Sequence, residues 1–206
     1  EEGKICEADI NKACRRILVA KYKLGLFQNP YKYCDETRAS NVILSKAHRD
    51  AARRIAAESF VLLKNKNDIL PLKKNGKIAV IGPLANNKPN MLGTWTVSAD
   101  LNSAVSVLEG IKTAVGNKAI IQYAQGCNFS YDEGIEKRVQ HAGKIFTRDG
   151  RSDAELTAEA LSIAENSDIV LAIMGEAAEM SGEAASRTDL NIPDAQKELL
   201  KQLVAT

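Results

Sequence analysis

The chain has 206 residues, of which 45% are hydrophobic, 26% are charged and 5% are aromatic, and its formal net charge is +2. These values are typical of a soluble globular protein with one domain of ordinary size, or with one domain and an appendage. Basic residues are interspersed with acidic ones, which argues against a nucleic-acid partner because such a partner usually requires a concentrated basic face. The low aromatic content argues against a small module that stacks sugars or single strands.

The sequence indicates no membrane anchor, metal site or cofactor. No segment approaches the roughly 18 to 20 consecutive apolar residues of a membrane-spanning helix. The chain begins Glu1-Glu2-Gly3-Lys4, without a Met or a signal peptide, and both of its ends look cut from a longer protein. The four cysteines form no CxxC pair and have no His at zinc-site spacing, so we interpret them as free, partly buried thiols, with a disulfide at Cys34 left open: Cys6, Cys14, Cys34 and Cys127.

Two helices are predicted in the first third of the chain. Glu7–Leu24 carries an apolar stripe that includes Ile10 and Ile17, and this stripe requires a partner because a single helix cannot bury it. Residues 31–44 lack periodicity and are interpreted as a linker. Ser45 is a plausible N-cap for a second helix that runs to about Leu63.

Strands and helices alternate in the rest of the chain. The predicted strands lack polar residues at alternate positions, as expected for strands covered on both faces: 77–82, 120–123 and 169–174. The predicted helices lie between and after them: 105–115, 154–164 and 195–204. This order indicates an α/β fold with a parallel sheet and helices on both of its faces. Residues 128–150 form a longer insertion, interpreted as a surface loop with some helix.

The loop that follows the first predicted strand is the place to look for nucleotide binding, because ligands gather beyond the carboxyl ends of parallel strands. The glycines of a dinucleotide-binding motif are missing there, and Pro83 removes a backbone donor, so a nucleotide-binding domain is disfavoured. Trp95, the single Trp, lies further along this loop. Two interpretations of Trp95 remain open, a core or interdomain plug and a platform for stacking a sugar.

The loop that follows the third predicted strand contains a cluster of carboxylates. Small residues surround Glu183, and a carboxyl in such a place can act as a general acid when burial or nearby negative charge favours its protonated form. The alternative is a solvated acidic loop with a few ion pairs, for instance to Arg187. His48 and His141 are isolated, which gives little support to a metal site or a Ser-His-Asp triad.

Several motifs in the right order resemble one enzyme family, glycoside hydrolase family 3. The stretch from His48 to Asn65, followed by Ile-Leu-Pro-Leu and Lys-Ile-Ala-Val-Ile-Gly-Pro, resembles the start of that family's second domain. The first helix with its exit is similar to the last helix of the family's TIM-like barrel. The loop SGEAASRTDL, residues 181–190, resembles bacterial periplasmic β-glucosidases in particular.

The resemblance implies a domain organisation and a pair of site residues. Residues 1–34 would be the last helix and exit of a barrel domain, residues 35–46 a linker, and residues 47–206 the first part of an α/β sandwich. Glu183 matches the acid/base of a retaining glycosidase, and Trp95 matches the aromatic wall on the leaving-group side of the cleft. Glu176 and Glu179 have weaker claims as structural or tuning groups. No Asp of this chain matches the family's nucleophile, which the barrel would carry.

The resemblance also implies a substrate class and a location. We expect β-glucosides as substrates, with β-xylosides second, and a periplasmic or secreted parent protein. The expected partners are this β-linked glucoside or oligosaccharide and the missing barrel, and we expect the chain alone to be inactive because it lacks the nucleophile. The alternative from a different class is a noncatalytic α/β module that binds a ligand or a partner domain.

Overall fold

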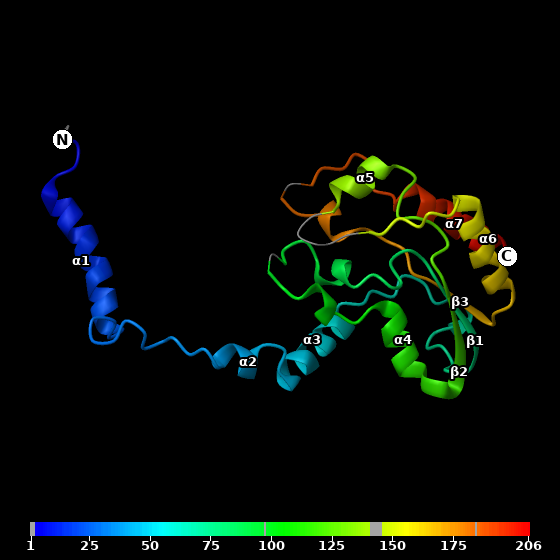
Figure 1. Ribbon diagram of the computed structural model, residues 1–206, viewed down its shortest axis with the longest axis horizontal. Coiled ribbons are helices and arrows are strands. Elements are labelled where there is room, and N and C mark those ends of the chain that lie inside the picture. The colour runs from blue at the N-terminus through cyan, green and yellow to red at the C-terminus, as the bar shows by residue number, and fades with distance from the viewer. Residues whose placement is uncertain (1–2, 97, 141–145, 184) are drawn as a thin grey trace. The chain divides into compact units, whose positions relative to one another are not determined.

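A computed structural model describes residues 3–96, 98–140, 146–183 and 185–206. Its contacts divide the chain into two compact units, Glu1–Ile69 and Leu70–Thr206, and each is described by itself. Figure 1 gives the labels of the helices and strands.

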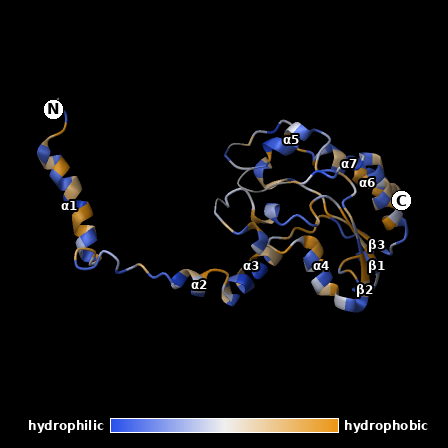
Figure 2. Cartoon of the chain, viewed as in Figure 1, coloured by the Kyte–Doolittle hydropathy of each residue, from blue (hydrophilic) through white to orange (hydrophobic). Residues whose placement is uncertain are grey.

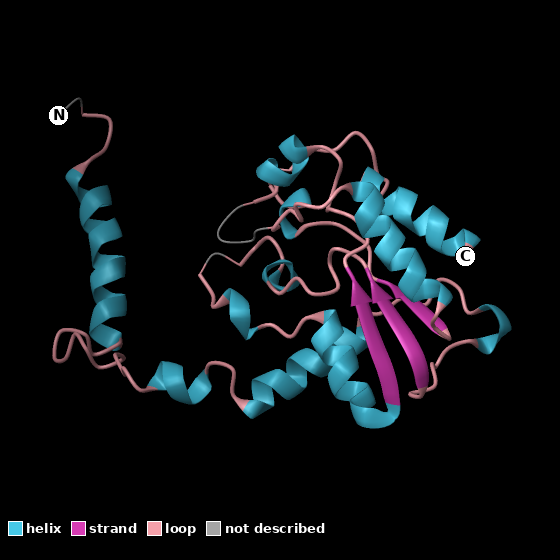
Figure 3. Ribbon diagram, turned by 45° about the vertical axis from the view of Figure 1, so that its right-hand side comes forward, coloured by secondary structure: helices cyan, strands magenta, loops and turns pink. Residues whose placement is uncertain are grey.

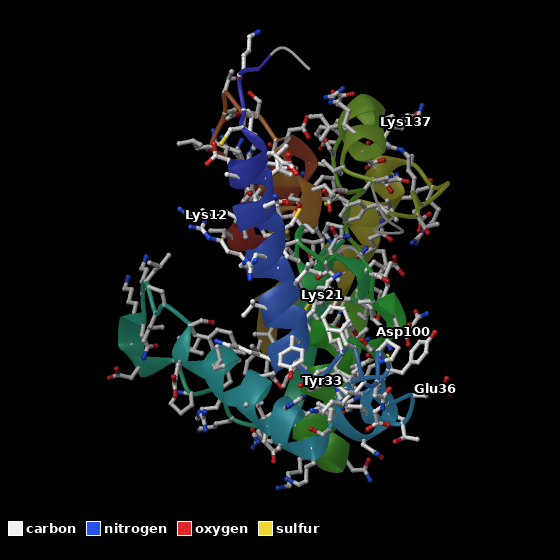
Figure 4. The ribbon with its side chains drawn as sticks, turned by 90° about the vertical axis from the view of Figure 1, so that its left-hand side faces the viewer. Lys12, Lys21, Tyr33, Glu36, Asp100 and Lys137 are labelled. Atoms are coloured by element: carbon white, nitrogen blue, oxygen red, sulfur yellow. The ribbon has the colours of Figure 1, made fainter. Side chains whose placement is uncertain are left out.

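The first unit is helical and has little core of its own. Helix α1 spans Glu7–Lys23 and contains no buried residue, so its apolar stripe remains exposed. The hydroxyl of Tyr33 donates to the carbonyl oxygen of Leu24 at 3.0 Å, which folds the following segment back on the end of α1 (Figure 4). The short helix α2, Arg38–Val42, interrupts the segment predicted as a linker.

Helix α3 spans Lys46–Glu58, and its N-cap is Ser45, as predicted. The Ser45 hydroxyl accepts a hydrogen bond from the backbone N–H of His48 at 3.4 Å. The predicted end near Leu63 was wrong, because the Ser59 hydroxyl donates to the carbonyl oxygen of Ala56 at 2.8 Å and competes with the helical backbone. The four residues that follow, Phe60 to Leu63, have no regular secondary structure and are largely exposed.

The second unit contains a parallel sheet of three strands, as predicted. The strands are β1 (Gly76–Ile81), β2 (Ala119–Ala124) and β3 (Ile169–Ala172), in the spatial order β2-β1-β3. Figure 3 shows them as arrows that run in the same direction. Gly76 pairs with Ala119 on one side of β1, and Ile78 pairs with Ile169 on the other.

Helices cover both faces of the sheet, which confirms the predicted α/β architecture. On one face, Ala79 and Ile81 of β1 pack with Ala160 of α6 (Asp153–Glu165) and Leu199 of α7 (Asp194–Ala205). On the other face, residues 78 and 80 pack with α4 (Val107–Val115). Figure 2 shows the strands coloured as hydrophobic and the helices as mixed, as this two-sided burial requires.

Two helices of this unit, α4 and α6, begin at capping boxes. In α6 the box is formed by Ser152 and Glu155. Helix α4 was predicted to begin at residue 105, but its N-cap is Ser106, whose hydroxyl accepts from the N–H of Glu109 at 3.2 Å. The Glu109 carboxylate accepts the Ser106 N–H in return, and this reciprocal pair fixes the start of the helix.

The insertion 128–150 contains some helix, as predicted, but it is not only a surface loop. It contains α5 (Glu133–Arg138) and a small core of its own around Phe129 and Val139. The rings of Phe129 and Phe146 stack with their centroids 4.3 Å apart. Glu136 is 4% exposed and pairs with Arg148 at 2.8 Å, so the insertion also buries a charge.

A buried glutamine joins this insertion to the sheet. Gln196, on α7, is fully buried and donates from Nε2 to the carbonyl oxygen of Phe129 at 3.1 Å. Its Oε1 accepts the backbone N–H of Gly175, just after β3, at 2.9 Å.

Among the described residues, no helix combines the length and the apolar character that crossing a membrane requires.

Candidate functional site

The candidate site lies beyond the carboxyl ends of β1 and β3. Strand β1 is central, and the chain passes from it to β2 on one side and then to β3 on the other, which makes the β1–β3 crevice a topological switch point. Gly82, with φ of +137°, ends β1, and a Cβ atom at this position would lie 2.0 Å from the carbonyl oxygen of Ile173. Only glycine therefore allows the two loops to leave the sheet so close together.

The loop after β1 carries Trp95. A short 3-10 turn, Pro89–Leu92, precedes it, and the side chain of Asn90 accepts the backbone N–H of Ala178 at 2.9 Å. The hydroxyl of Thr94 donates to Oε2 of Glu179 at 3.2 Å. Trp95 itself is 72% exposed, so the interpretation as a core plug is wrong for this unit. Its indole is therefore accessible to solvent.

The loop after β3 carries Glu183, which is exposed. Its neighbour Gly182 has φ of +113°, and a Cβ atom at Gly182 would lie 3.0 Å from the Thr94 hydroxyl oxygen. The side chain of Thr94 therefore covers the backbone of Gly182. Because Thr94 precedes Trp95 and Gly182 precedes Glu183, this contact brings together the loops of the two residues that the sequence singled out.

Arg187 holds the Glu183 loop together, but through a different carboxylate. Its guanidinium forms an ion pair with Glu176 and donates from Nη2 to the carbonyl oxygen of Asn191 at 2.6 Å. The prediction of an ion pair in this loop is thus confirmed, and the partner is Glu176. One side chain joins the beginning of the loop to its end, so the segment with Glu183 is held at both sides.

The loop end near Asn191 is fixed by a further turn. The Asp189 carboxylate accepts the backbone N–H of Asn191 at 2.9 Å and its side-chain amide at 2.6 Å. These hydrogen bonds, the backbone one first, lower the pKa of Asp189. Asp189 therefore serves as an ionised structural group.

The remaining predictions concern the cysteines, a possible metal site and the histidines. The four cysteines are free, with Cys6, Cys14 and Cys34 exposed and Cys127 buried, and burial raises the pKa of Cys127 to about 12. Across the described parts of the chain, no group of three or more His, Cys, Asp or Glu side chains is arranged to hold a metal. His141 falls outside the described residues.

The contacts of Thr94 and Asn90, and the identity of the partner of Arg187, were not predicted from the sequence. Thr94 and Glu179 are 85 residues apart, and neither carries a local signal of the contact between them. The carboxylates near Arg187 in the sequence indicated that it forms an ion pair, but several of them were possible partners.

Residues 60–206 match the model of the glycosyl hydrolase family 3 C-terminal domain. The chain belongs to glycoside hydrolase family 3. This membership confirms the resemblance that the motifs indicated.

Relatives within family 3 align with the whole chain. It is 40% identical to the periplasmic beta-glucosidase of Salmonella typhimurium, covering 100% of this chain and 27% of that protein. It is 35% identical to a beta-xylosidase of Formosa agariphila, with 96% and 25% covered. A solved beta-glucosidase from Listeria innocua in complex with glucose superposes with a TM-score of 0.72 at 31% identity, covering 98% of this chain and 24% of that one. The chain therefore spans about a quarter of the length of these relatives.

Proposed function

We propose that this chain is the part of a retaining β-glucosidase that supplies the general acid/base, and that Glu183 is this group. The observation that carries the proposal is the contact between Thr94 and Gly182, which places the Glu183 loop against the Trp95 loop at the switch point of the sheet. Family membership and the named relatives support it.

In this mechanism Glu183 has two roles. It first protonates the glycosidic oxygen as the leaving group departs and an Asp nucleophile of the barrel domain attacks the anomeric carbon. It then removes a proton from the water that cleaves the glycosyl-enzyme, which restores the acid form. A retaining enzyme needs its two carboxyl groups roughly 5 to 5.5 Å apart, so the barrel must bring the nucleophile to that distance from Glu183.

Trp95 is proposed to line the leaving-group side of the cleft. An indole face suits the apolar C–H face of a pyranose, and the exposure of Trp95 leaves that face accessible. Loop contacts through Thr94 and Glu179 would hold the indole at a fixed place relative to Glu183.

The first unit is proposed to belong in part to the barrel domain, with residues 1–34 as its last helix and exit and residues 35–46 as a linker to the sandwich domain. The exposed stripe on α1, which includes Ile10, Ile17 and Leu18, supports this assignment because such a stripe requires a covering surface. A periplasmic or secreted location is proposed from the Salmonella relative.

The test of this function compares the 206-residue chain with the full-length polypeptide that contains it. The full-length protein is expected to hydrolyse 4-nitrophenyl β-glucoside, and to do so faster than the β-xyloside. The chain alone is expected to release no nitrophenol, because it brings no nucleophile. NMR of the first product should show the β-anomer of glucose. Turnover by the chain alone that disappears in Glu183→Gln would contradict this division of labour, and an inactive full-length protein would favour a noncatalytic module.

A smaller effect is expected from Thr94→Val in the full-length protein. The change keeps the shape of the side chain but removes the hydrogen bond to Glu179, so kcat/KM for cellobiose should fall about three- to tenfold. The loss should be smaller for 2,4-dinitrophenyl β-glucoside, which needs little protonation, and Thr94→Ser should restore the activity. Thr113→Val, which removes an exposed hydroxyl on α4, is the matched control. Equal losses for both substrates would show that Thr94 does not position the acid.

A further inference from the structure

A cavity of about 380 Å³ lies beyond the carboxyl ends of β1 and β2. The loop that follows β1 forms one wall, with Asn86 and Asn87, and the two ends of the insertion 128–150 form another, with Asn128 and Arg148. Of the described residues, none from the loop that follows β3 lines it, so the cavity does not include the Glu183 loop. Its volume is near the lower end of the range of roughly 300 to 1,000 Å³ that is usual for small-molecule sites, which suits a ligand of one ring.

The side-chain amide of Asn128 offers this cavity a hydrogen-bond donor. Asn128 is 2% exposed, and its Oδ1 accepts the backbone N–H of Asp149 at 2.9 Å. That backbone donor fixes which atom of the amide is the oxygen. Asn128 makes two side-chain hydrogen bonds with described residues and both go to Oδ1, so Nδ2 has no partner among them. A buried donor of this kind is costly without a partner, and a polar group of a ligand in the cavity would satisfy it.

Gln125 places an acceptor beside this donor. Its Nε2 donates to Oδ1 of Asn128 at 3.4 Å, which leaves its Oε1 for a ligand. A donor and an acceptor side by side fit a hydroxyl group, which accepts from one and donates to the other. On the loop that follows β1, Oδ1 of Asn86 accepts the Ser106 hydroxyl at 3.1 Å, which leaves a further amide donor. The cavity therefore suits a ligand with several hydroxyl groups.

Charge and ring surface both favour a neutral ligand. The ionised side chains among the described residues of the lining are Glu136 and Arg148, and they pair with each other at 2.8 Å. A charged ligand would thus find its counter-ion already taken. Aromatic rings line the cavity as well, from Tyr123, Phe129 and Phe146. Phe129 stacks against the partly buried Phe146 with the ring centroids 4.3 Å apart, which gives a firm apolar surface.

We propose that this cavity binds a single neutral sugar, such as free glucose, at a site apart from Glu183 and Trp95. The amides suit the hydroxyl groups of a sugar ring, and the aromatic rings suit its apolar C–H face. This inference goes beyond the acid/base function and does not depend on it.

The test titrates D-glucose into the ¹⁵N-labelled 206-residue chain and follows the side-chain amides by NMR. The chain is sufficient because the lining runs from Pro83 to Arg148. We expect the amide signals of Asn128 and Gln125 to shift with a Kd of about 1 to 10 mM, as suits so small a ligand. Cyclohexylmethanol has a six-membered ring but a single hydroxyl, and it should bind at least about tenfold more weakly because it leaves the amides unpaired.

Two variants locate the bound sugar. Asn128→Asp keeps an acceptor for the N–H of Asp149 but removes the Nδ2 donor, and Thr147→Trp fills the cavity from an exposed position. Each should weaken glucose binding at least about tenfold, as read from the Gln125 signal. Thr113→Trp, at an exposed threonine on α4, is the matched control for the added indole. Thr113→Trp and Trp95→Ala should each change the Kd less than about twofold.

The outcomes separate this site from the proposed cleft. An absence of shifts at about 100 mM glucose, or undiminished shifts in Thr147→Trp, would overturn the inference. Binding that disappears in Trp95→Ala would place the sugar at Trp95 and overturn it as well, and so would equal affinities for glucose and cyclohexylmethanol. If Asn128→Asp does not fold, Thr147→Trp decides alone. The kinetics of Glu183→Ala bear on the acid/base role and not on this cavity, so the two proposals fail separately.

Discussion

Glu183→Ala in the full-length polypeptide is expected to lower kcat/KM for cellobiose by about 10²- to 10⁴-fold, the range that a positioned general acid contributes. The glucose leaving group of cellobiose is a poor one and requires protonation as the bond breaks. A 2,4-dinitrophenyl leaving group does not, so the first step should be much less affected with that substrate. The comparison of the two substrates is measured by steady-state kinetics.

Azide gives this prediction a second measurement. A small anion can occupy the space left by the Glu183 side chain and attack the glycosyl-enzyme without needing a base. Azide should therefore raise kcat for the dinitrophenyl substrate and produce β-glucosyl azide, which NMR identifies. Glu198→Ala, on the exposed side of α7, is the matched control and should behave like the unaltered protein. Unchanged kinetics in Glu183→Ala would instead favour the noncatalytic module.

Arg148→Met is expected to destabilise the chain by about 3 kcal/mol or more, because breaking a buried ion pair from one side leaves an uncompensated charge. The side chain of Glu136 is 6% exposed, whereas that of Arg148 is 32% exposed, so the carboxylate is the group left without solvent. Arg148 also donates to the carbonyl oxygen of Ser130 at 3.1 Å. Urea denaturation of the 206-residue chain, followed by circular dichroism at pH 7, measures the effect.

The matched control is Arg151→Met, which removes an exposed guanidinium paired with Asp149 and Glu159. Hydrogen bonds from the Arg151 side chain and then its backbone lower the pKa of Asp149 to about 2. The contribution of this pair is present above the unfolded pKa of about 3.9 and is lost as the pH falls through about 2, so it is intact at pH 7. Because solvent screens this exposed pair, Arg151→Met should cost much less stability than Arg148→Met.

The double variant Glu136→Gln with Arg148→Met separates charge from packing. It removes the carboxylate charge that Arg148→Met leaves unpaired, and it should recover part of the lost stability. Equal effects of Arg148→Met and Arg151→Met would show that the Glu136 carboxylate finds another partner.

The sheet could be predicted because its information is local. Runs of apolar and β-branched residues marked all three strands, and the absence of alternation indicated that helices cover both faces. The ends of the helices were less predictable where they depended on the hydrogen bond of a single serine hydroxyl. Helix α3 ended at Ser59, earlier than predicted, and α4 began after Ser106, two residues later than the predicted start at residue 105.

The insertion 128–150 shows why the burial of some residues could not be predicted. Its charged composition suggested a solvated loop, yet Glu136 is buried because Arg148, 12 residues later, pairs with it. The candidate site shows the same limit. Motifs pointed to Glu183 and Trp95, but the contact of their loops depends on side chains distant in sequence, such as Thr94 and Glu179. Local sequence patterns do not indicate contacts between residues that are far apart in the chain.

The buried Gln196 helps to fix the two ends of the loop that follows β3. It holds Gly175 at the beginning of the loop that follows β3, and Asp194, bonded to Ser130, holds the end of the same loop at the start of α7. Both attachment points therefore belong to the scaffold and not to the loop itself. We therefore expect substitutions among the residues between them to leave the sheet beneath unchanged, even where they alter the candidate site at Gly182 and Glu183.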